Sequence, residues 1–512
     1  MIRSVLAAAF AAALAGACAV PGSAAEPEPA TSPAPLPKTP AAITRHRTVV
    51  NGASVAYTAT AGYTRLTDKE GRPAAAMFSV AYERDGVAHA RRPVAFLWNG
   101  GPGSSTLWLH MGSFAPLRVP VDGTRPVRQP GSLVPNDGTL LGATDLVFVD
   151  MPGAGFSRIG DRGKKTDFWG IDQDARAFAQ FVRNWLTAHD RWGSPKYLIG
   201  ESYGTTRAAN VVNRLQESGV GVNGVVLVSS ALDLTALDPS LPGDDLSNVA
   251  FLPTEAAVAW YNDALPAPKP AQLAPFLDEV RAYAAGPYAT ALLRGDQLDA
   301  GARADVVAHL QRYLGLDAAY VERADLRVDP TRFEKELQRK RGRLTGRLDG
   351  RFFGYDLDRN ADSPAFDPTL DATIQDAYVS EFNRYVRDDL RFRTDETYKP
   401  TIYDEIGGKW DLTRDAGDAG LPNVQLPNVL PDLAQALTRN PNLRVFSANG
   451  LFDLATPFFG TEIALHHLGL DPALRSHVTY GYYPAGHMMY LDDASRRALR
   501  RDIERFVRET AP

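Results

Sequence analysis

The chain has 512 residues, of which 44% are hydrophobic, and a formal net charge of −5. This length can bury a large core, and the small charge imbalance argues against a protein built to bind nucleic acid or an anionic membrane. The single cysteine, Cys18, excludes a fold held by internal disulfides.

Residues 1–25 are typical of a signal peptide. Arg3 is followed by an apolar run over residues 5–15 that is too short to cross a bilayer, and then by small residues. An alternative is a lipoprotein signal, in which residues 14–18 form an imperfect lipobox and Cys18 carries the lipid. In both cases we expect an exported protein, periplasmic or secreted, without a transmembrane span.

The rest of the chain is expected to divide into a linker and one interrupted domain. Residues 26–42 are rich in proline and alanine and predict an extended or disordered linker. A sheet domain is expected in two parts, residues 43–235 and 440–512, with a helical insertion over residues 236–439 between them.

Strand and helix patterns alternate in the first part of this domain. Alternating segments between residues 47 and 82 indicate antiparallel strands, and an amphipathic stretch over residues 172–188 predicts a helix. Alternation of strands and helices is typical of an α/β fold with a mostly parallel sheet covered on both faces. The buried strands are expected over residues 94–98, 145–150, 196–199 and 224–230.

The pattern changes after about residue 232. Amphipathic helices are expected over residues 276–284, 304–313 and 374–390, with no clear buried strand among them. Because strands resume at residues 443–449, we expect an insertion that caps the active site. Its basic segment, residues 335–351, also contains acidic residues, which favours a solvated face over a nucleic-acid site.

The pentapeptide Gly-Glu-Ser-Tyr-Gly at residues 200–204 lies between an apolar strand and an amphipathic helix. A G-x-S-x-G at such a junction predicts a nucleophile elbow, in which a strained turn lifts the hydroxyl of Ser202 clear of the sheet. The motif can also arise by chance in a chain with 43 glycines, although no other serine fits the pattern.

A serine nucleophile needs a base and a group that orients the base. In open parallel sheets such groups lie on loops at the carboxyl ends of strands. His487 follows the last expected strand, residues 477–483, and Asp453 follows the strand before it. Each could be structural when taken singly, but the chain order Ser202, Asp453, His487 is that of the α/β-hydrolase triad.

An oxyanion hole requires a second N–H donor, usually from a loop after an earlier strand. The glycine-rich residues 98–105 directly follow a buried strand, so the backbone there can approach a substrate closely. The alternative is an ordinary glycine-rich turn.

Three blocks resemble the signature blocks of the serine carboxypeptidase family: WNGGPGSS at residues 98–105, DMPGAGFS at 150–157 and GESYG at 200–204. Residues 450–457 and 485–488 resemble the aspartate and histidine blocks of the same family, in the same order. The resemblance implies an α/β-hydrolase fold with an inserted cap. It also implies removal of carboxyl-terminal residues from peptides through an acyl-enzyme.

The resemblance also implies roles for particular residues. They are Ser202, Asp453 and His487 as the triad, N–H groups of Gly101 and Tyr203 as the oxyanion hole, and Asn99, Gly100 and Glu201 as partners of the substrate's free carboxylate. No metal and no cofactor are expected.

The chain departs from the family at one position. The family pairs the glutamate before the nucleophile with a second acid, and the position that matches this acid holds Ser113. We therefore expect the acid pair to be absent and the pH optimum to lie nearer neutral, set by deprotonation of His487. Arg347 or Arg351 is a candidate to replace the missing acid in binding the substrate carboxylate, because guanidinium binds carboxylate in a bidentate manner.

We expect a serine carboxypeptidase whose substrates are peptides with a free C-terminal carboxylate, and no nucleic-acid partner. An esterase or acyltransferase with the same triad is the first alternative, because a triad and an oxyanion hole serve peptides and esters alike. A non-catalytic envelope binding protein with a hydrolase fold is the second.

Overall fold

The computed structural model describes residues 35–239, 243–414 and 427–512. The predicted signal peptide, residues 1–25, and with it Cys18 lie outside these ranges, as does the predicted linker up to residue 34. The first strand begins at Ala42, where the predicted linker ends. None of the helices in the described ranges is both long and apolar enough to cross a membrane.

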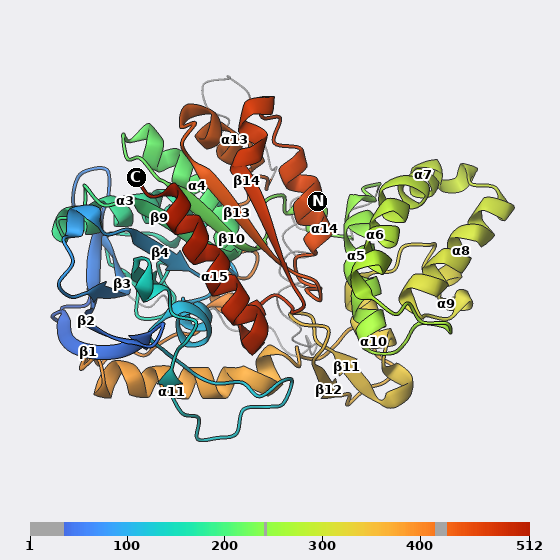
Figure 1. The fold of residues 1–512 in the computed structure, drawn as a ribbon, viewed down its shortest axis with the longest axis horizontal. Coiled ribbons are helices and arrows are strands. Elements are labelled where there is room, and N and C mark those ends of the chain that lie inside the picture. The colour runs from blue at the N-terminus through green and yellow to red at the C-terminus, as the bar shows by residue number, and fades with distance from the viewer. Residues whose placement is uncertain (1–34, 240–242, 415–426) are drawn as a thin grey trace.

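One mixed sheet forms the centre of the fold (Figure 1). In spatial order its strands are β1 (Ala42–Val50), β2 (Ala53–Thr67), β3 (Pro73–Arg84), β7 (Asp145–Val149), β4 (Val94–Trp98), β9 (Lys196–Ser202), β10 (Gly224–Ser230), β13 (Arg444–Gly450) and β14 (Val478–Tyr483). Strands β1 to β3 are antiparallel, and the strands from β7 to β14 in this order are parallel. The predicted α/β class with a mostly parallel sheet is confirmed.

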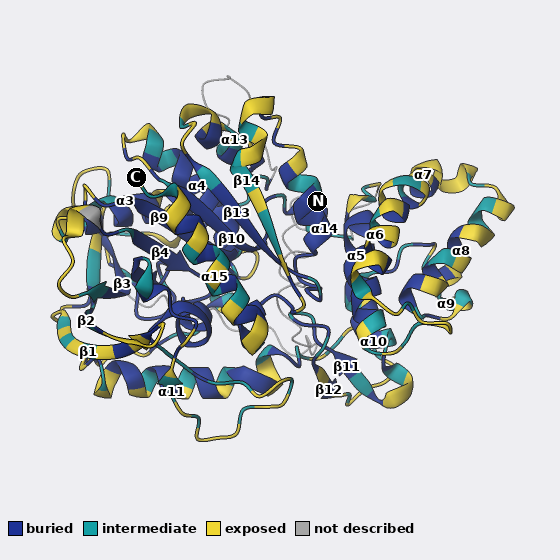
Figure 2. Ribbon diagram, viewed as in Figure 1, coloured by how far each residue is buried: buried dark blue, intermediate teal, exposed yellow. Residues whose placement is uncertain are grey.

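Helices cover both faces of the parallel strands. They are α3 (Ile171–Ala188), α4 (Tyr203–Glu217) and α13 (Leu430–Arg439) on one face, and α11 (Gln375–Asp388) and α15 (Asp493–Thr510) on the other. Within β4, Phe96 and Trp98 pack toward α3 and α4, whereas Ala95 and Leu97 pack toward α15, because successive side chains of a strand point to opposite faces. Figure 2 shows the resulting buried layer along the sheet.

Part of the chain between β10 and β13 forms a separate helical lobe, on the right of Figure 1. It contains α5 (Leu246–Tyr261), α6 (Leu273–Tyr283), α7 (Ala289–Arg294), α8 (Ala300–Leu314), α9 (Ala318–Arg323), α10 (Pro330–Glu336) and the hairpin of β11 (Arg343–Thr345) and β12 (Phe353–Tyr355). The hairpin was not predicted, because its strands are too short for a pattern of alternation. Helices α11 and α13 also fall in the range 236–439, but they pack against the sheet and not in this lobe.

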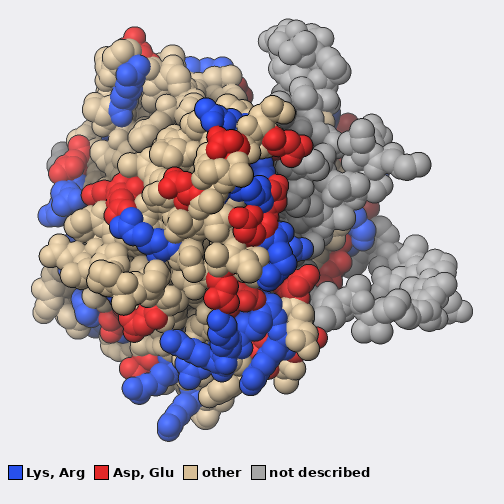
Figure 3. Space-filling model, turned by 90° about the vertical axis from the view of Figure 1, so that its right-hand side faces the viewer, with Lys and Arg blue, Asp and Glu red and all other residues tan. Residues whose placement is uncertain are grey.

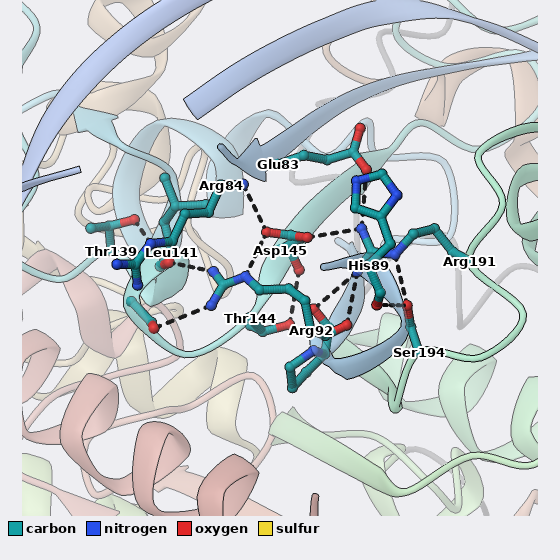
Figure 4. A network of polar contacts seen from close by, with 12 residues as sticks. Glu83, Arg84, His89, Arg92, Thr139, Leu141, Thr144, Asp145, Arg191 and Ser194 are labelled. Atoms are coloured by element: carbon teal, nitrogen blue, oxygen red, sulfur yellow. Dashed lines mark hydrogen bonds and ion pairs between the residues drawn. The ribbon is translucent and has the colours of Figure 1, made fainter. Parts of the chain in front are cut away.

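The amino ends of the parallel strands carry a buried ion-pair network (Figure 4). Asp145, at the start of β7, accepts hydrogen bonds from Arg92 Nε at 2.9 Å, from Arg191 Nη1 at 2.8 Å and from the N–H of Arg84 at 2.9 Å. Arg191 also pairs with Glu83 at 3.0 Å. Loss of one partner would leave an uncompensated buried charge, so this network fixes the end of the sheet opposite the carboxyl edge.

The prediction that residues 335–351 form a solvated face is wrong for part of the segment. Lys335 is buried and pairs with Asp356 at 2.7 Å, and Arg351 pairs with the buried Asp349 at 2.7 Å. A charge pattern alone does not show which side chains find partners inside the lobe. On the outer face drawn in Figure 3, acidic and basic side chains are intermixed, with basic ones gathered toward its lower end.

Candidate active site

Ser202 lies at the junction of β9 and α4, with φ of 60° and ψ of −132°. This conformation is unfavourable for a residue with a side chain, and such strain is typical of a nucleophile elbow. A Cβ atom on Gly200 would overlap the carbonyl group of Gly204, so the tight turn requires glycine there. The turn is also fixed by the indole of Trp98, which donates to the Gly204 carbonyl at 2.9 Å.

His487 and Asp453 meet at the same carboxyl edge of the sheet, on the loops after β14 and β13. Nδ1 of His487 lies 2.8 Å from Oδ2 of Asp453, and both side chains are buried. Oδ1 of Asp453 accepts the N–H groups of Ala455 at 2.8 Å and Thr456 at 2.9 Å. Asp453 is therefore held as an acceptor that directs a proton onto Nδ1 and leaves Nε2 of His487 as the basic nitrogen.

Two opposing effects set the basicity of His487. Burial lowers the pKa of His487, but the charge of Asp453 and its hydrogen bond raise it, and the net pKa lies above the ordinary value of 6.5. Glu201 also raises this pKa, and Arg347 lowers it. The raised pKa makes His487 a stronger base for the proton of a serine hydroxyl.

Ser202 and His487 line one cavity of about 420 Å³, which is large enough for a small substrate. Its walls come from the carboxyl edge of the sheet and from residues 331–375. No hydrogen bond joins Ser202 to His487 among the described residues, and such contacts often form only with substrate bound. An apolar groove of about 450 Å³ beside α13 and α14 (Phe458–His466) contains neither residue.

The two residues expected to form the oxyanion hole also line this cavity. Tyr203 is the first residue of α4, so its N–H has no acceptor within the helix and lies at the positive end of the helix dipole. Gly101 has φ of 109°, in the loop after β4. The buried Arg207 holds this loop, because its Nη1 donates to the Asn99 carbonyl at 2.6 Å and its Nε to Asp174 at 2.7 Å.

Asn99 and Glu201 form a buried pair beside Ser202. Nδ2 of Asn99 donates to Oε1 of Glu201 at 2.8 Å, and Oδ1 of Asn99 accepts the N–H of Leu109 at 3.0 Å. Burial raises the pKa of Glu201 to about 7. Near neutral pH a large fraction of Glu201 is therefore a neutral acid, which can donate a hydrogen bond to an anionic group.

No hydrogen bond joins Ser113 to Glu201 in the part of the chain that the structure describes. The hydroxyl of Ser113 donates to the carbonyl of Leu109 at 2.6 Å, inside the π-helical turn His110–Phe114. The neighbour of Glu201 that sequence reasoning missed is Tyr490, a buried phenol that interacts with it electrostatically without a hydrogen bond within 3.5 Å. No motif marks Tyr490, which lies just after the histidine block.

A short segment of the insertion holds the loop of Asp453. We call residues 347–351 the strap. The carbonyl of Arg347 accepts the N–H of Leu454 at 3.0 Å, and the N–H of Gly350 donates to the carbonyl of Phe452 at 2.9 Å. These two bonds fix the backbone on either side of Asp453.

The strap also holds the loop of His487. The N–H of His487 donates to the carbonyl of Leu348 at 2.6 Å, and the N–H of Gly486 donates to Oδ2 of Asp349 at 2.9 Å. A Cβ atom at Gly486 would overlap the strap, so only glycine allows this approach. Arg351 completes the contact, because its Nη1 donates to the Pro484 carbonyl at 2.8 Å while its guanidinium pairs with Asp349.

The sheet order, the elbow and the histidine–aspartate pair at the carboxyl edge define a serine hydrolase of the α/β-hydrolase type. Residues 50–223 match the sequence profile of the serine carboxypeptidase family. The predicted resemblance to this family is confirmed over that segment, which includes the glycine-rich loop and the elbow. No curated protein matches the chain significantly.

Solved structures that match most of the chain do so at low sequence identity. The proline iminopeptidase of Mycobacterium smegmatis is 12% identical, with a TM-score of 0.38, and the match covers 88% of this chain and 99% of that one. A thermostable carboxyl esterase of Bacillus coagulans is 11% identical, with a TM-score of 0.37 and coverage of 88% and 99%. A lipase in its open form is 14% identical, with a TM-score of 0.37 and the same coverage.

Proposed function

We propose that the protein is a serine carboxypeptidase that releases the last residue of a peptide. The observation that carries this proposal is the buried pair of Asn99 and Glu201 beside Ser202. An amide N–H and a neutral carboxylic acid, both lining the cavity, suit a free carboxylate one residue beyond the reacting carbonyl. An esterase has no need of such a pair.

In the proposed reaction, Oγ of Ser202 attacks the carbonyl carbon of the last peptide bond while Nε2 of His487 takes its proton. The N–H groups of Gly101 and Tyr203 bind the oxygen that becomes negative. When the intermediate collapses, the C–N bond breaks and His487 gives its proton to the leaving amine. Water, deprotonated by His487, then attacks the ester on Ser202 and releases the shortened peptide.

The proposal predicts a strict demand for a free carboxylate. For a blocked dipeptide and its C-terminal amide, kcat/KM should differ by about 100-fold or more, because two hydrogen bonds to a charged group are lost with the amide. Steady-state hydrolysis of the matched pair measures this ratio. Equal rates for the two, with faster cleavage of simple esters or acyl transfer to an added alcohol, would favour an esterase or acyltransferase instead.

The two titrating groups predict a bell-shaped pH profile for peptides. The rising limb should extend above pH 6.5, because the pKa of His487 is raised and the base must be neutral. The rate should fall above about pH 7, where Glu201, whose burial raises its pKa to about 7, ionises and repels the substrate carboxylate. We expect kcat/KM for a free-carboxylate peptide to peak near neutral pH.

A p-nitrophenyl ester without a carboxylate should keep the rising limb of this profile and lose the falling one. Glu201→Gln should also lose the falling limb on peptides, because its amide does not ionise. A falling limb of the same pKa on the ester would show that Glu201 does not control carboxylate binding.

A further inference from the structure

The side chain of Arg347 lines the same cavity as Ser202 and His487. It belongs to the strap. Of the two arginines considered from the sequence, Arg351 is committed to Asp349 and to the Pro484 carbonyl, so it has no free edge for a ligand. Arg347 is therefore the remaining candidate for an anion partner.

The guanidinium of Arg347 has no protein partner among the described residues. No carboxylate oxygen of these residues lies within 4.0 Å of it, and no hydrogen bond uses its N–H groups. An arginine stays charged at any pH that a protein tolerates, and its five N–H donors require acceptors. A half-buried guanidinium in this condition is suited to an anionic ligand.

The acidic groups that face Arg347 do not neutralise it by direct contact. Burial raises the pKa of Glu334 well above its ordinary value. Both oxygens of Asp367 accept backbone N–H groups, from Leu348 at 3.0 Å and from Thr369 at 2.9 Å. Burial also raises the pKa of Asp367.

The strap brings Arg347 next to the loops that carry Asp453 and His487. The carbonyl of Arg347 is bonded to Leu454, next to Asp453, and the carbonyl of the following residue is bonded to the N–H of His487. In the proposed reaction the leaving amine takes its proton from His487. The α-carboxylate of that leaving residue lies only two bonds from the amine nitrogen, about 2.5 Å away, and so must lie on the same side.

We infer that Arg347 binds the α-carboxylate of the leaving residue as a charged fork, in addition to Asn99 and Glu201. The inference rests on the proposed carboxypeptidase activity. It makes Arg347 a source of attraction for the carboxylate that does not depend on the protonation of Glu201. Guanidinium and carboxylate match in charge and in planar geometry.

The test uses Arg347→Gln and Arg347→Lys on three substrates: a blocked dipeptide, its C-terminal amide and a p-nitrophenyl ester without a carboxylate. For Arg347→Gln, KM for the dipeptide should rise about 10- to 100-fold, the range expected when a hydrogen bond to a charged group is lost. KM for the ester should rise far less. Arg347→Lys should recover part of the dipeptide binding, because lysine keeps the positive charge.

Arg343→Gln is the matched control. Arg343 lies on the same hairpin but stacks over Phe353, with its guanidinium carbon 4.0 Å from the ring centre.

The possible outcomes separate this inference from the proposed function. If the wild-type enzyme does not prefer the dipeptide to its amide, the proposed function itself fails and the inference fails with it. If the preference exists but Arg347→Gln keeps it within about threefold, only the role of Arg347 is overturned. Equal losses of kcat/KM for the dipeptide and for the ester would also overturn the role of Arg347, because they would show that the substitution disturbs the triad. The rate of fluorophosphonate labelling of each variant reports whether Ser202 is still reactive.

Discussion

Ser202→Ala is expected to lose both hydrolysis and covalent labelling by a fluorophosphonate. The substitution removes the attacking oxygen while the Cβ atom and the strained backbone at this position stay the same. The fold should therefore be retained while kcat falls by about 10⁶-fold, as when a serine nucleophile is removed elsewhere. Labelling followed by mass spectrometry, with circular dichroism as a check of folding, measures the result.

Ser230→Ala is the matched control for this experiment. Ser230 pairs directly with Ser202 across β9 and β10, and its buried hydroxyl has no hydrogen-bond partner among the described residues. The Ser230→Ala enzyme should react with the fluorophosphonate and hydrolyse peptides at rates close to those of the wild type. Persistent labelling of Ser202→Ala at another residue would assign the nucleophile elsewhere.

Asp453→Asn is expected to lower kcat by about 10⁴-fold with little change in KM. Oδ1 of Asp453 is held by two backbone N–H groups, so the carboxamide of asparagine can satisfy them only by turning its NH₂ group toward His487. That group cannot accept the proton on Nδ1, and His487 would carry its proton on Nε2, where it cannot act as a base. Steady-state assays of blocked-dipeptide hydrolysis measure the loss of kcat.

The control for this variant is Asp471→Asn, an exposed carboxylate that accepts the N–H of Ala473 at 2.9 Å. It should retain full activity, because it lies outside the cavity. A loss of less than about tenfold in Asp453→Asn, with the fold intact, would mean that Asp453 does not orient His487.

Local patterns predicted two geometric features of the carboxyl edge, the strained turn at Ser202 and the contact of His487 with Asp453. The G-x-S-x-G motif needs only its own strand and helix to form the elbow, so five consecutive residues are enough to select Ser202 as the candidate nucleophile. Asp453 and His487 could be chosen because the loops after parallel strands meet at one edge, whatever the distance between them in sequence. The helix bounds differ by only a few residues from those expected, as with α3 at Ile171–Ala188.

The contacts that complete the site could not be predicted, because they join distant residues without a repeating pattern. Nothing in the strap sequence indicates that Asp349 accepts the N–H of Gly486, which lies far along the chain. The orientation of Ser113 depends on a π-helical turn, and the contact of Tyr490 with Glu201 depends on packing. The packing of α11 and α13 against the sheet likewise follows from tertiary contacts and not from helix periodicity.

The strap limits how this architecture can be recombined. In a hydrolase whose lid is an independent module, a chimera with a foreign lid changes substrate choice and leaves turnover nearly intact. Here the grafted piece would also carry the Leu348 carbonyl that accepts the N–H of His487 and the Asp349 carboxylate that accepts the N–H of Gly486. Exchange of the whole insertion should therefore alter turnover as well as selectivity, whereas exchange confined to α6 through α9 would leave those bonds in place.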